Sequence, residues 1–269
     1  MLRAPLYQSL CLLLIGSVVI FPTQAADEPD WAREQRLDTQ TRDAVFDGEP
    51  IDLEADGRSF LAIDMEADED PKGGVILMHG RGFQPDWHQV AGPLRVSLAE
   101  AGWRTLSIQM PVLEKQAKYY DYVPVLKFGS SRINAAIAHM RDQGVDNIIL
   151  LAHSCSVHMA MHWVKSPDRP RIQAFVGIGM GATDYKQPMA NPLPLDKLGV
   201  PVLDVRGSND FNAVHRFAPR RWAAIDSLGF TSSKQVVIED SNHYFDERHE
   251  ALHDAVESWL SSNNGFRAQ

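Results

Sequence analysis

Short apolar runs alternate with longer helical patterns along most of this 269-residue chain. Each run is rich in Val, Ile and Leu, as buried strands are, and the stretch after it repeats apolar residues at helical spacing. This alternation predicts an α/β fold, with a mostly parallel central sheet and helices on both faces. The predicted strands are Val75–Met78, Trp103–Ile108, Asn147–Ala152, Ile172–Ile178, Val200–Val205 and Lys234–Ile238. The predicted helices are Trp87–Ala101, Ser131–Gln143, Cys155–Lys165, Phe211–Leu228 and Asp246–Leu260.

The segment ahead of these elements divides into two parts. Residues 27–49 are polar and show no sustained apolar period, so we expect a lead-in along the surface, with its helical content left open. Residues 50–64 alternate on either side of Asp56-Gly57, a dipeptide that favours a tight turn. That pattern predicts an antiparallel strand pair before the parallel part of the sheet.

Residues 1–25 have the pattern of a secretory signal peptide. A single charge, Arg3, precedes an apolar run over residues 10–21, and a small residue, Ala25, follows. A membrane span needs roughly 20 apolar residues, so we expect no stable membrane anchor once this shorter run is removed. We expect cleavage after Ala25, export to the periplasm or the medium, and a single mature domain over residues 26–269.

Charge and cysteine content disfavour several other classes of protein. The chain has 26 Lys and Arg against 35 Asp and Glu, a formal net charge of −9, which disfavours binding to nucleic acid. Its two cysteines, Cys11 and Cys155, are too few for a four-thiolate metal site. We expect no cofactor and no metal, and a small molecule as the binding partner.

Residues 148–156 (IILLAHSCS) carry the strongest chemical signal. An apolar strand runs into small residues and then a helix, as in a nucleophile elbow, where a serine is exposed on a sharp turn. The residues two before and two after the nucleophile approach each other, so both must be small. With Ser154 as nucleophile they are Ala152 and Ser156, whereas Cys155 would place larger residues there. We predict Ser154 as the nucleophile, with a plain serine-capped helix as the alternative.

Two later strands end in loops that carry an acid and a histidine. Asp210 follows the strand Val200–Val205, and His243 follows the strand Lys234–Ile238. The carboxyl ends of parallel strands share one edge of a sheet, so we expect both side chains near Ser154. There His243 would take the serine proton, and Asp210 would orient the imidazole ring. Three rival acids stay open: Asp204, Asp184 and Asp240.

The turn after the strand Val75–Met78 is a candidate for binding an oxyanion. Residues 79–82 (HGRG) place glycines around a turn at the same edge of the sheet, where main-chain N–H groups can point at the reacting centre. We predict that the N–H groups of Arg81 and Cys155 form an oxyanion hole. Gly82 is the alternative to Arg81.

Four features together resemble the α/β-hydrolase superfamily: the HGRG turn, the elbow at Ser154, and Asp210 and His243 in that order. The resemblance covers roughly residues 50–262. The stretch HGRGFQPDWHQVAGPLR, followed by GWRTLSIQMP, is similar to a group of exported bacterial α/β-hydrolase-like proteins of uncharacterised function. The resemblance implies the α/β-hydrolase fold and hydrolysis of a carboxylester or related acyl substrate through an acyl-serine intermediate.

The elbow departs from the common Gly-x-Ser-x-Gly pattern. Ala152 and Ser156 stand at the two glycine positions and add two Cβ atoms where the turn is tightest. Strained backbone positions cost about 1–3 kcal/mol each, which a surrounding fold can absorb. The departure leaves open a second function, a non-catalytic α/β-hydrolase-fold protein that binds a partner or ligand of the cell envelope.

Several aromatic and imidazole side chains are candidates for substrate binding. The tyrosine-rich residues 111–129 follow a strand at the expected site edge, and ordinary surface packing is the alternative for them. Residues 183–198 are too few for a large helical lid, so we expect a small lid or none. The candidate substrate-binding residues are His79, Trp87, Tyr119, Tyr120 and Tyr122.

Two histidine pairs have a spacing that can bind metal. His249, Glu250 and His253 match the H-E-x-x-H pattern of zinc peptidases, but the sequence offers no evident third ligand after them. His158 and His162 share the spacing without the glutamate. We expect neither pair to bind metal, and zinc peptidase chemistry on the last helix stays as a third possibility.

Overall fold

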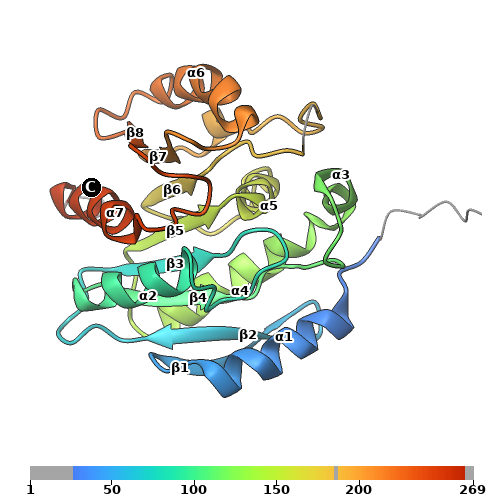
Figure 1. The fold of residues 1–269 in the computed structure, drawn as a ribbon. Helices are drawn as coiled ribbons and strands as arrows, with labels where there is room; N and C mark the ends of the chain where they lie inside the picture. Colours follow the sequence, from blue (N-terminus) through green and yellow to red (C-terminus); the bar gives the residue numbers. More distant parts are fainter. Residues whose placement is uncertain (1–26, 185–186, 264–269) are drawn as a thin grey trace, which may run out of the picture.

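A computed structural model describes residues 27–184 and 187–263, so the expected signal peptide lies outside the described residues. Figure 1 shows strands and helices alternating along most of this range. The helices are α1 (Trp31–Ala44), α2 (Ala91–Glu100), α3 (Tyr119–Tyr122), α4 (Phe128–Asp142), α5 (Cys155–Trp163), α6 (Asn212–Asp226) and α7 (His249–Ser262), with 3-10 turns η1 (Val123–Val125) and η2 (Leu195–Lys197). The strands are β1 (Glu49–Ala55), β2 (Arg58–Met65), β3 (Gly74–Met78), β4 (Arg104–Ile108), β5 (Ile148–His153), β6 (Ala174–Ile178), β7 (Val202–Gly207) and β8 (Lys234–Ile238).

The strands form one eight-stranded sheet in the order β1-β2-β4-β3-β5-β6-β7-β8. The first two neighbouring pairs are antiparallel, and every pair from β4 onward is parallel. The β1–β2 hairpin turns at Asp56 and Gly57, which have φ angles of 52° and 72°. The predicted α/β fold and the predicted hairpin are therefore confirmed.

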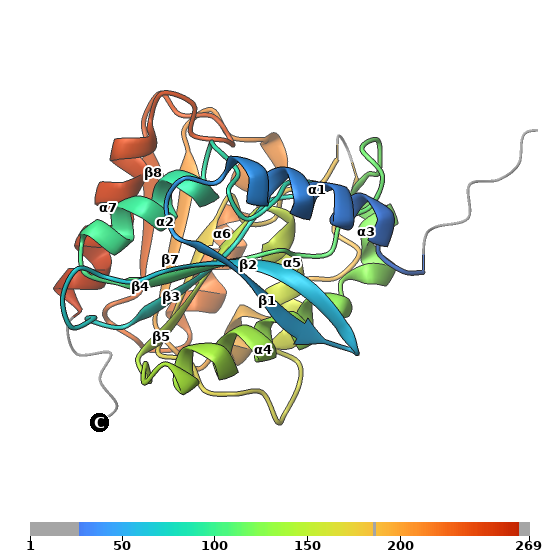
Figure 2. The same ribbon diagram turned by 90° about the horizontal axis from the view of Figure 1, so that it is seen from below.

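Helices cover both faces of the sheet (Figure 2). Helices α2 and α7 pack on one face with Leu77, Leu151 and Val205, while α4 and α5 pack on the other with Ile76 and Leu150. Successive residues of a strand point to opposite faces, so central strands buried on both sides are apolar throughout. None of the described helices is long and apolar enough to cross a bilayer.

Helix α1 is the main element that the sequence left open. It is polar, but Asp30 caps its first turn by accepting a hydrogen bond from the Arg33 N–H at 2.9 Å. Glu34, buried at 8% exposure, forms an ion pair with Arg132 of α4 at 2.7 Å. Contacts with distant residues therefore stabilise this helix, and an apolar stripe does not.

Two helices begin later than predicted. Helix α2 begins at Ala91 because the residues before it form turns, in which the Trp87 ring stacks on Phe83 with 3.8 Å between centroids. Helix α7 begins at His249 because Phe245 and Glu247 have positive φ angles of 57° and 58°, which a right-handed helix excludes.

The strand register brings the loops that carry the candidate site together. Met78 at the end of β3 pairs with Ala152 of β5, and His153 pairs with Ile178 at the end of β6. Gly207 likewise pairs with Ile238 where β7 and β8 end. Between β6 and β7 the described residues contain only η2 as regular structure, so the expectation of a small lid or none is confirmed.

A buried ion pair joins β7 to α6. Asp204 is fully buried and accepts hydrogen bonds from Arg221 at 2.8 Å and from Gln235 at 2.7 Å. Arg221 also donates to the main-chain carbonyls of Met180 and Val214. The pair therefore holds the helix against the end of the sheet that carries Asp210.

We predict that Asp204→Ala lowers the free energy of unfolding by about 3–5 kcal/mol, because it leaves the buried Arg221 charge without its carboxylate. Urea unfolding followed by circular dichroism measures the change. Asp254→Ala, at an exposed position of α7, is the control and should stay within about 0.5 kcal/mol of the parent protein. Equal midpoints and slopes for the two variants would contradict the prediction.

Candidate active site

Ser154 occupies a strained turn between β5 and α5. Its φ of 56° and ψ of −112° lie outside the helical and extended regions that serine prefers. The main-chain N–H of Ser154 donates to the Ile178 carbonyl at 2.9 Å, and its carbonyl accepts from the Val157 N–H at 3.1 Å. The backbone is therefore held from both sides, as the predicted elbow requires, and the serine hydroxyl projects beyond the sheet.

The two residues that replace the usual glycines are accommodated. Ala152 is fully buried within β5, and Ser156 in the first turn of α5 is 1% exposed. The Ser156 hydroxyl donates a hydrogen bond to the main-chain carbonyl of His79. Ser156 therefore links the elbow to the turn after β3, which a glycine at this position would not do.

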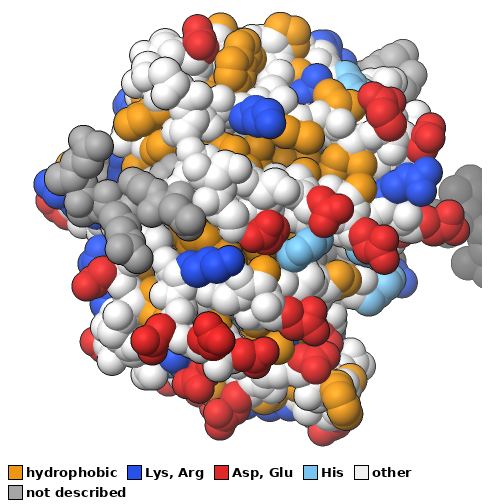
Figure 3. All heavy atoms as spheres, turned by 90° about the vertical axis from the view of Figure 1, so that its left-hand side faces the viewer, with side chains coloured by type: hydrophobic (Ala, Val, Ile, Leu, Met, Phe, Trp, Pro, Cys, Tyr) orange, Lys and Arg blue, Asp and Glu red, His pale blue; other side chains and the backbone are white. Residues whose placement is uncertain are grey.

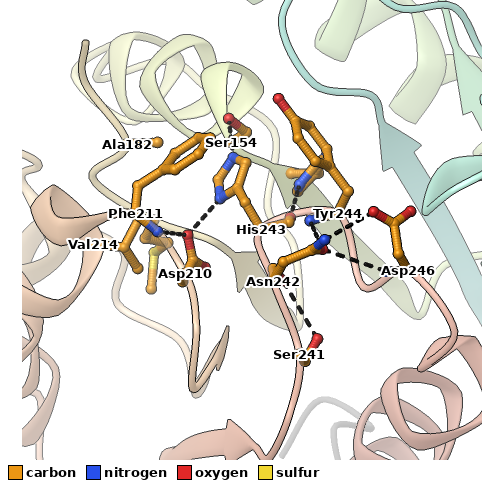
Figure 4. Close-up of polar contacts among 12 residues, drawn as sticks. Ser154, Ala182, Asp210, Phe211, Val214, Ser241, Asn242, His243, Tyr244 and Asp246 are labelled. Carbon is orange, nitrogen blue, oxygen red and sulfur yellow. Dashed lines mark hydrogen bonds and ion pairs between the residues drawn. The ribbon is translucent and has the colours of Figure 1, made fainter. Parts of the chain in front are cut away.

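Three side chains form a line of hydrogen bonds above the sheet (Figure 4). His243 Nε2 lies 2.8 Å from Ser154 Oγ, and His243 Nδ1 lies 2.6 Å from Asp210 Oδ1. All three residues are buried, with His243 only 2% exposed. The structure thus brings together the predicted nucleophile, base and acid, from the loops after β5, β8 and β7.

The surroundings of Asp210 keep its carboxyl group ionised. Burial alone would raise the pKa of Asp210, but the hydrogen bond and charge of His243 lower it, as does the Phe211 N–H, so the net shift is downward. An ionised carboxylate accepts a hydrogen bond from the Nδ1–H group of the imidazole, and this tautomer leaves Nε2 free to accept the proton of Ser154. The Phe211 ring stacks on the His243 ring with 4.3 Å between centroids.

Two glycines make room for the histidine and its loop. Gly179 has a φ of 60°, and a Cβ there would lie 2.6 Å from His243 Cε1. A Cβ on Gly207 would lie 2.2 Å from the Ser241 carbonyl oxygen. Both contacts are shorter than real Cβ atoms tolerate, so a side chain at either position would displace the loop that carries His243.

The rival acids have other partners. Asp204 lies within β7 and forms its ion pair with Arg221 of α6. Asp184 receives two hydrogen bonds from the Arg81 guanidinium, both at 3.0 Å. The Asp240 side chain is 83% exposed. Among these acids and Asp210, the structure places Asp210 against the imidazole.

Two of the three candidate oxyanion donors lie at the pocket. Arg81 and Cys155 both line the pocket above Ser154, as oxyanion donors require. Gly82, the alternative to Arg81, is not among the lining residues. The Arg33 guanidinium donates to the Gly82 carbonyl at 2.9 Å and to the Leu113 carbonyl.

The thiol beside the serine does not compete as a nucleophile. Burial raises the pKa of Cys155 to about 12, so its sulfur stays protonated at neutral pH. A thiol needs its thiolate form to attack. This supports the serine register of the elbow.

The pocket in front of Ser154 has a volume of about 560 Å³. Four aromatic rings contribute to its wall, together with polar groups of the loop after β6 and of helix α6. Three of these rings, those of Phe83, Phe211 and Tyr244, were not predicted from the sequence. Tyr244 and Phe211 directly follow His243 and Asp210 in the chain, and that adjacency was a signal for both. The lining residues are Arg81, Phe83, Tyr119, Ser154, Cys155, Ala182, Thr183, Asp184, Phe211, Asn212, Ala213, Arg216, His243 and Tyr244.

Only Tyr119 of the five predicted substrate-binding residues lines the pocket. Trp87 stacks on Phe83 from outside, and Tyr120 donates its hydroxyl proton to the Pro188 carbonyl. Tyr122 is 1% exposed, and its hydroxyl accepts the Leu113 N–H. The prediction is corrected for Trp87, Tyr120 and Tyr122, whose contacts hold the loops around the site.

The prediction for His79 is also corrected. Its ring is buried in the turn after β3, where Nδ1 donates to the Gly80 carbonyl at 2.7 Å and Nε2 accepts the Met110 N–H at 2.9 Å. The bond from Met110 joins the loops after β3 and β4, and the bond to Gly80 holds the ring within its own loop. Burial lowers the pKa of His79 to about 4, so the ring is neutral and fixed as a structural link.

A second buried histidine supports the candidate base. His153 immediately precedes Ser154 and is 1% exposed. Its Nε2 lies 3.1 Å from the main-chain oxygen of His243 and donates to it. Burial, followed by repulsion from His243, lowers the pKa of His153 to about 3. The neutral ring therefore anchors the backbone of the residue whose side chain contacts Ser154.

Neither histidine pair forms a metal centre with other ligands. Among residues 27–184 and 187–263, no three His, Cys, Asp or Glu side chains gather as metal ligands would. His158 and His162 lie on α5, where His158 contacts the Ala182 carbonyl and His162 contacts Ser130.

The sequence matches one family model along nearly its whole length. The model is described as "Protein of unknown function (DUF3530)" and matches residues 6–122 and 126–262. The chain belongs to the DUF3530 family. No curated protein sequence matches it.

Solved structures show the same fold at low sequence identity. Est1E from Butyrivibrio proteoclasticus is 15% identical with a TM-score of 0.60, over 79% of this chain and 98% of that one. XC6422 from Xanthomonas campestris, described as an α/β serine hydrolase without lid, is 15% identical with a TM-score of 0.59, over 81% and 95%. A monoacylglycerol lipase from Paleococcus ferrophilus is 16% identical with a TM-score of 0.56, over 76% and 99%. The DUF3530 chain therefore has the α/β-hydrolase fold.

We predict that the protein loses stability as the pH falls from about 6.5 to about 4. Burial lowers the pKa of His79 and His158 to about 4 and that of His153 to about 3. The unfolded chain takes up these protons near pH 6.5, whereas the folded chain does not. Each histidine then lowers the free energy of unfolding by about 1.4 kcal/mol per pH unit in this range.

Urea unfolding at several pH values measures this slope. His158→Gln should make the slope shallower by about 1.4 kcal/mol per pH unit, the contribution of one buried histidine. His88→Gln, at an exposed position, should leave the slope unchanged. The same slope in His158→Gln and in the parent protein would show that His158 is not held neutral.

Proposed function

We propose that the protein is a serine hydrolase that cleaves a carboxylester or related acyl substrate through an acyl-serine intermediate. The observation that carries the proposal is the continuous line from Ser154 Oγ to His243 at 2.8 Å and from His243 to Asp210 at 2.6 Å, with Ser154 facing a pocket. The partner is then a small-molecule ester, and the reaction needs no cofactor.

In the first half of the reaction, His243 Nε2 takes the hydroxyl proton while Ser154 Oγ attacks the ester carbonyl carbon. The carbonyl oxygen becomes an oxyanion, which the main-chain N–H groups of Arg81 and Cys155 stabilise. The tetrahedral intermediate collapses, the bond to the alcohol breaks, and His243 gives its proton to the leaving oxygen. Asp210 stabilises the imidazolium that exists between these two transfers.

In the second half, water takes the place of the alcohol. His243 accepts one proton from water, and the hydroxide attacks the acyl carbon that is bound to Ser154 Oγ. Collapse releases the carboxylic acid and returns the proton to the serine. The open pocket lets water reach the acyl-enzyme without movement of a large lid.

The structural neighbours support the proposal. Their descriptions name α/β serine hydrolases and a monoacylglycerol lipase, and one Est1E structure contains ferulic acid. Their low identity leaves the substrate to be decided by the pocket of this chain.

We predict that a fluorophosphonate probe labels Ser154, because His243 activates its hydroxyl. Peptide mass spectrometry of the treated protein locates the adduct. Ser154→Ala should abolish labelling and lower ester hydrolysis by about 10⁴- to 10⁶-fold. Ser227→Ala, at an exposed position of the chain, is the matched control and should change neither.

A folded protein that neither labels nor hydrolyses any ester would overturn the proposal. It would favour the non-catalytic binding protein that the Ala152 and Ser156 substitutions left open. The hydrogen bond from Ser156 to the His79 carbonyl argues against that alternative, because the side chain at this usual glycine position supports the turn after β3.

We predict that Asp210→Asn lowers kcat by about 10⁴-fold, because an amide cannot orient and stabilise the imidazolium as a carboxylate does. Steady-state kinetics with a para-nitrophenyl ester measure the loss. Asp240→Asn, on the exposed rival acid of the His243 loop, should retain activity. If Asp240→Asn were the inactive variant, the assignment of the acid would be wrong.

We also propose that residues 1–25 direct export and are removed after Ala25. The apolar run over residues 10–21 and the small residue Ala25 at the cleavage position support this. The intact mass of protein recovered from the periplasm or medium tests this. A mature chain that begins at Ala26 is expected, and a full-length chain in the cytoplasm would contradict the proposal.

A further inference from the structure

The pocket beside Ser154 is lined by two arginines and one carboxylate, apart from the reacting residues. Arg81 and Asp184 form a two-pronged ion pair, with both N to O distances at 3.0 Å. The same carboxylate accepts the Tyr119 N–H. This pair ties three loops together, and its two charges cancel each other.

The second arginine has no such partner. Arg216 is exposed on α6, and its guanidinium lies 5.0 Å from the ring centre of neighbouring Phe217. It forms no ion pair with any described Asp or Glu. Ala213, three positions earlier and on the same side of the helix, also lines the pocket. Arg216 therefore leaves one uncompensated positive charge in the pocket wall.

This charge contrasts with the formal net charge of the whole chain, which is −9. Figure 3 shows the side of the molecule where β2 ends and β3 begins, opposite to the carboxyl ends of the parallel strands, and acidic side chains are prominent in its lower half. The exposed acids between these strands include Glu66, Asp68, Glu69 and Asp70. These acids repel a negative ligand, whereas the charge of Arg216 at the pocket attracts one.

The remaining wall suits a flat or apolar group. The rings of Phe83 and Tyr244 lie edge to face at 5.9 Å, and Phe211 stacks on the imidazole of His243. A guanidinium next to apolar surface binds a carboxylate or phosphate by charge-assisted hydrogen bonds. The pocket thus combines apolar walls with one group that binds anions.

We propose that Arg216 selects esters that carry a negative charge, such as a carboxylate, away from the reacting carbonyl. The inference rests on the proposed hydrolase function and defines its substrate class. Arg216 takes no part in bond cleavage, because the hydrogen-bonded line from Ser154 to Asp210 is complete without it.

Matched esters test the proposal in the full enzyme. One pair of para-nitrophenyl esters has acyl chains that end in a carboxylate or in its methyl ester. A second pair of aryl acetates carries the carboxylate or its methyl ester on the alcohol side. In at least one of the two pairs, we expect Arg216→Gln to lower kcat/KM for the anionic ester by about 2- to 10-fold relative to the neutral ester.

Arg220→Gln is the matched control, because Arg220 is exposed on the same helix and does not line the pocket. It should leave the ratio of the two esters unchanged. Raising the salt from about 0.01 M to about 1 M should reduce the anionic preference of the parent protein but not that of Arg216→Gln. Equal ratios for the parent and Arg216→Gln in both pairs would overturn the proposal.

Binding separates this inference from the proposed reaction. Ser154→Ala cannot form the acyl-serine, so calorimetry can measure its affinity for the intact esters. We expect tighter binding of one anionic ester by Ser154→Ala, and loss of that advantage when Arg216→Gln is added. This result would support the anion site even if the parent protein hydrolysed no ester. Equal affinities with and without Arg216 would overturn the site even in an active hydrolase.

Discussion

The backbone turn at Ser154 is the constraint that the rest of the site depends on. A serine with a φ of 56° is strained by about 1–3 kcal/mol, so neighbouring structure must hold it. The hydrogen bond to Ile178 supplies part of this support, and the one from Ser156 to the His79 carbonyl supplies another. Because β5 lies between β3 and β6, the turn starts from the middle of the sheet, where the backbone has least freedom to relax.

The loops around this turn are tied to one another and need no large covering domain. His79 joins the loops after β3 and β4, and His153 joins the elbow to the His243 loop. The ion pair of Arg81 and Asp184 connects the turn after β3 to the loop after β6. Buried neutral imidazoles suit such links because each can donate and accept once without bringing a charge into the interior.

Much of the fold and the three central site residues could be predicted because they depend on local patterns. Apolar runs mark the strands, and the carboxyl ends of parallel strands must share an edge, which placed Asp210 and His243 near Ser154. Helix α1 could not be predicted in this way, because Glu34 docks on a residue 98 positions away. Nor could the role of His79, because its place in the turn after β3 does not tell whether its ring lines the pocket or packs away from it.

The docking of α1 sets an order for folding during synthesis. Helix α1 is synthesised before the residues that hold it, because Arg33 contacts Leu113 and Glu34 contacts Arg132. Because α1 is polar, it exposes no apolar face to water before these partner residues have been synthesised. The turn that carries Arg81 therefore gains its support from α1 only after residue 132 has been synthesised, and a shorter nascent chain lacks this support.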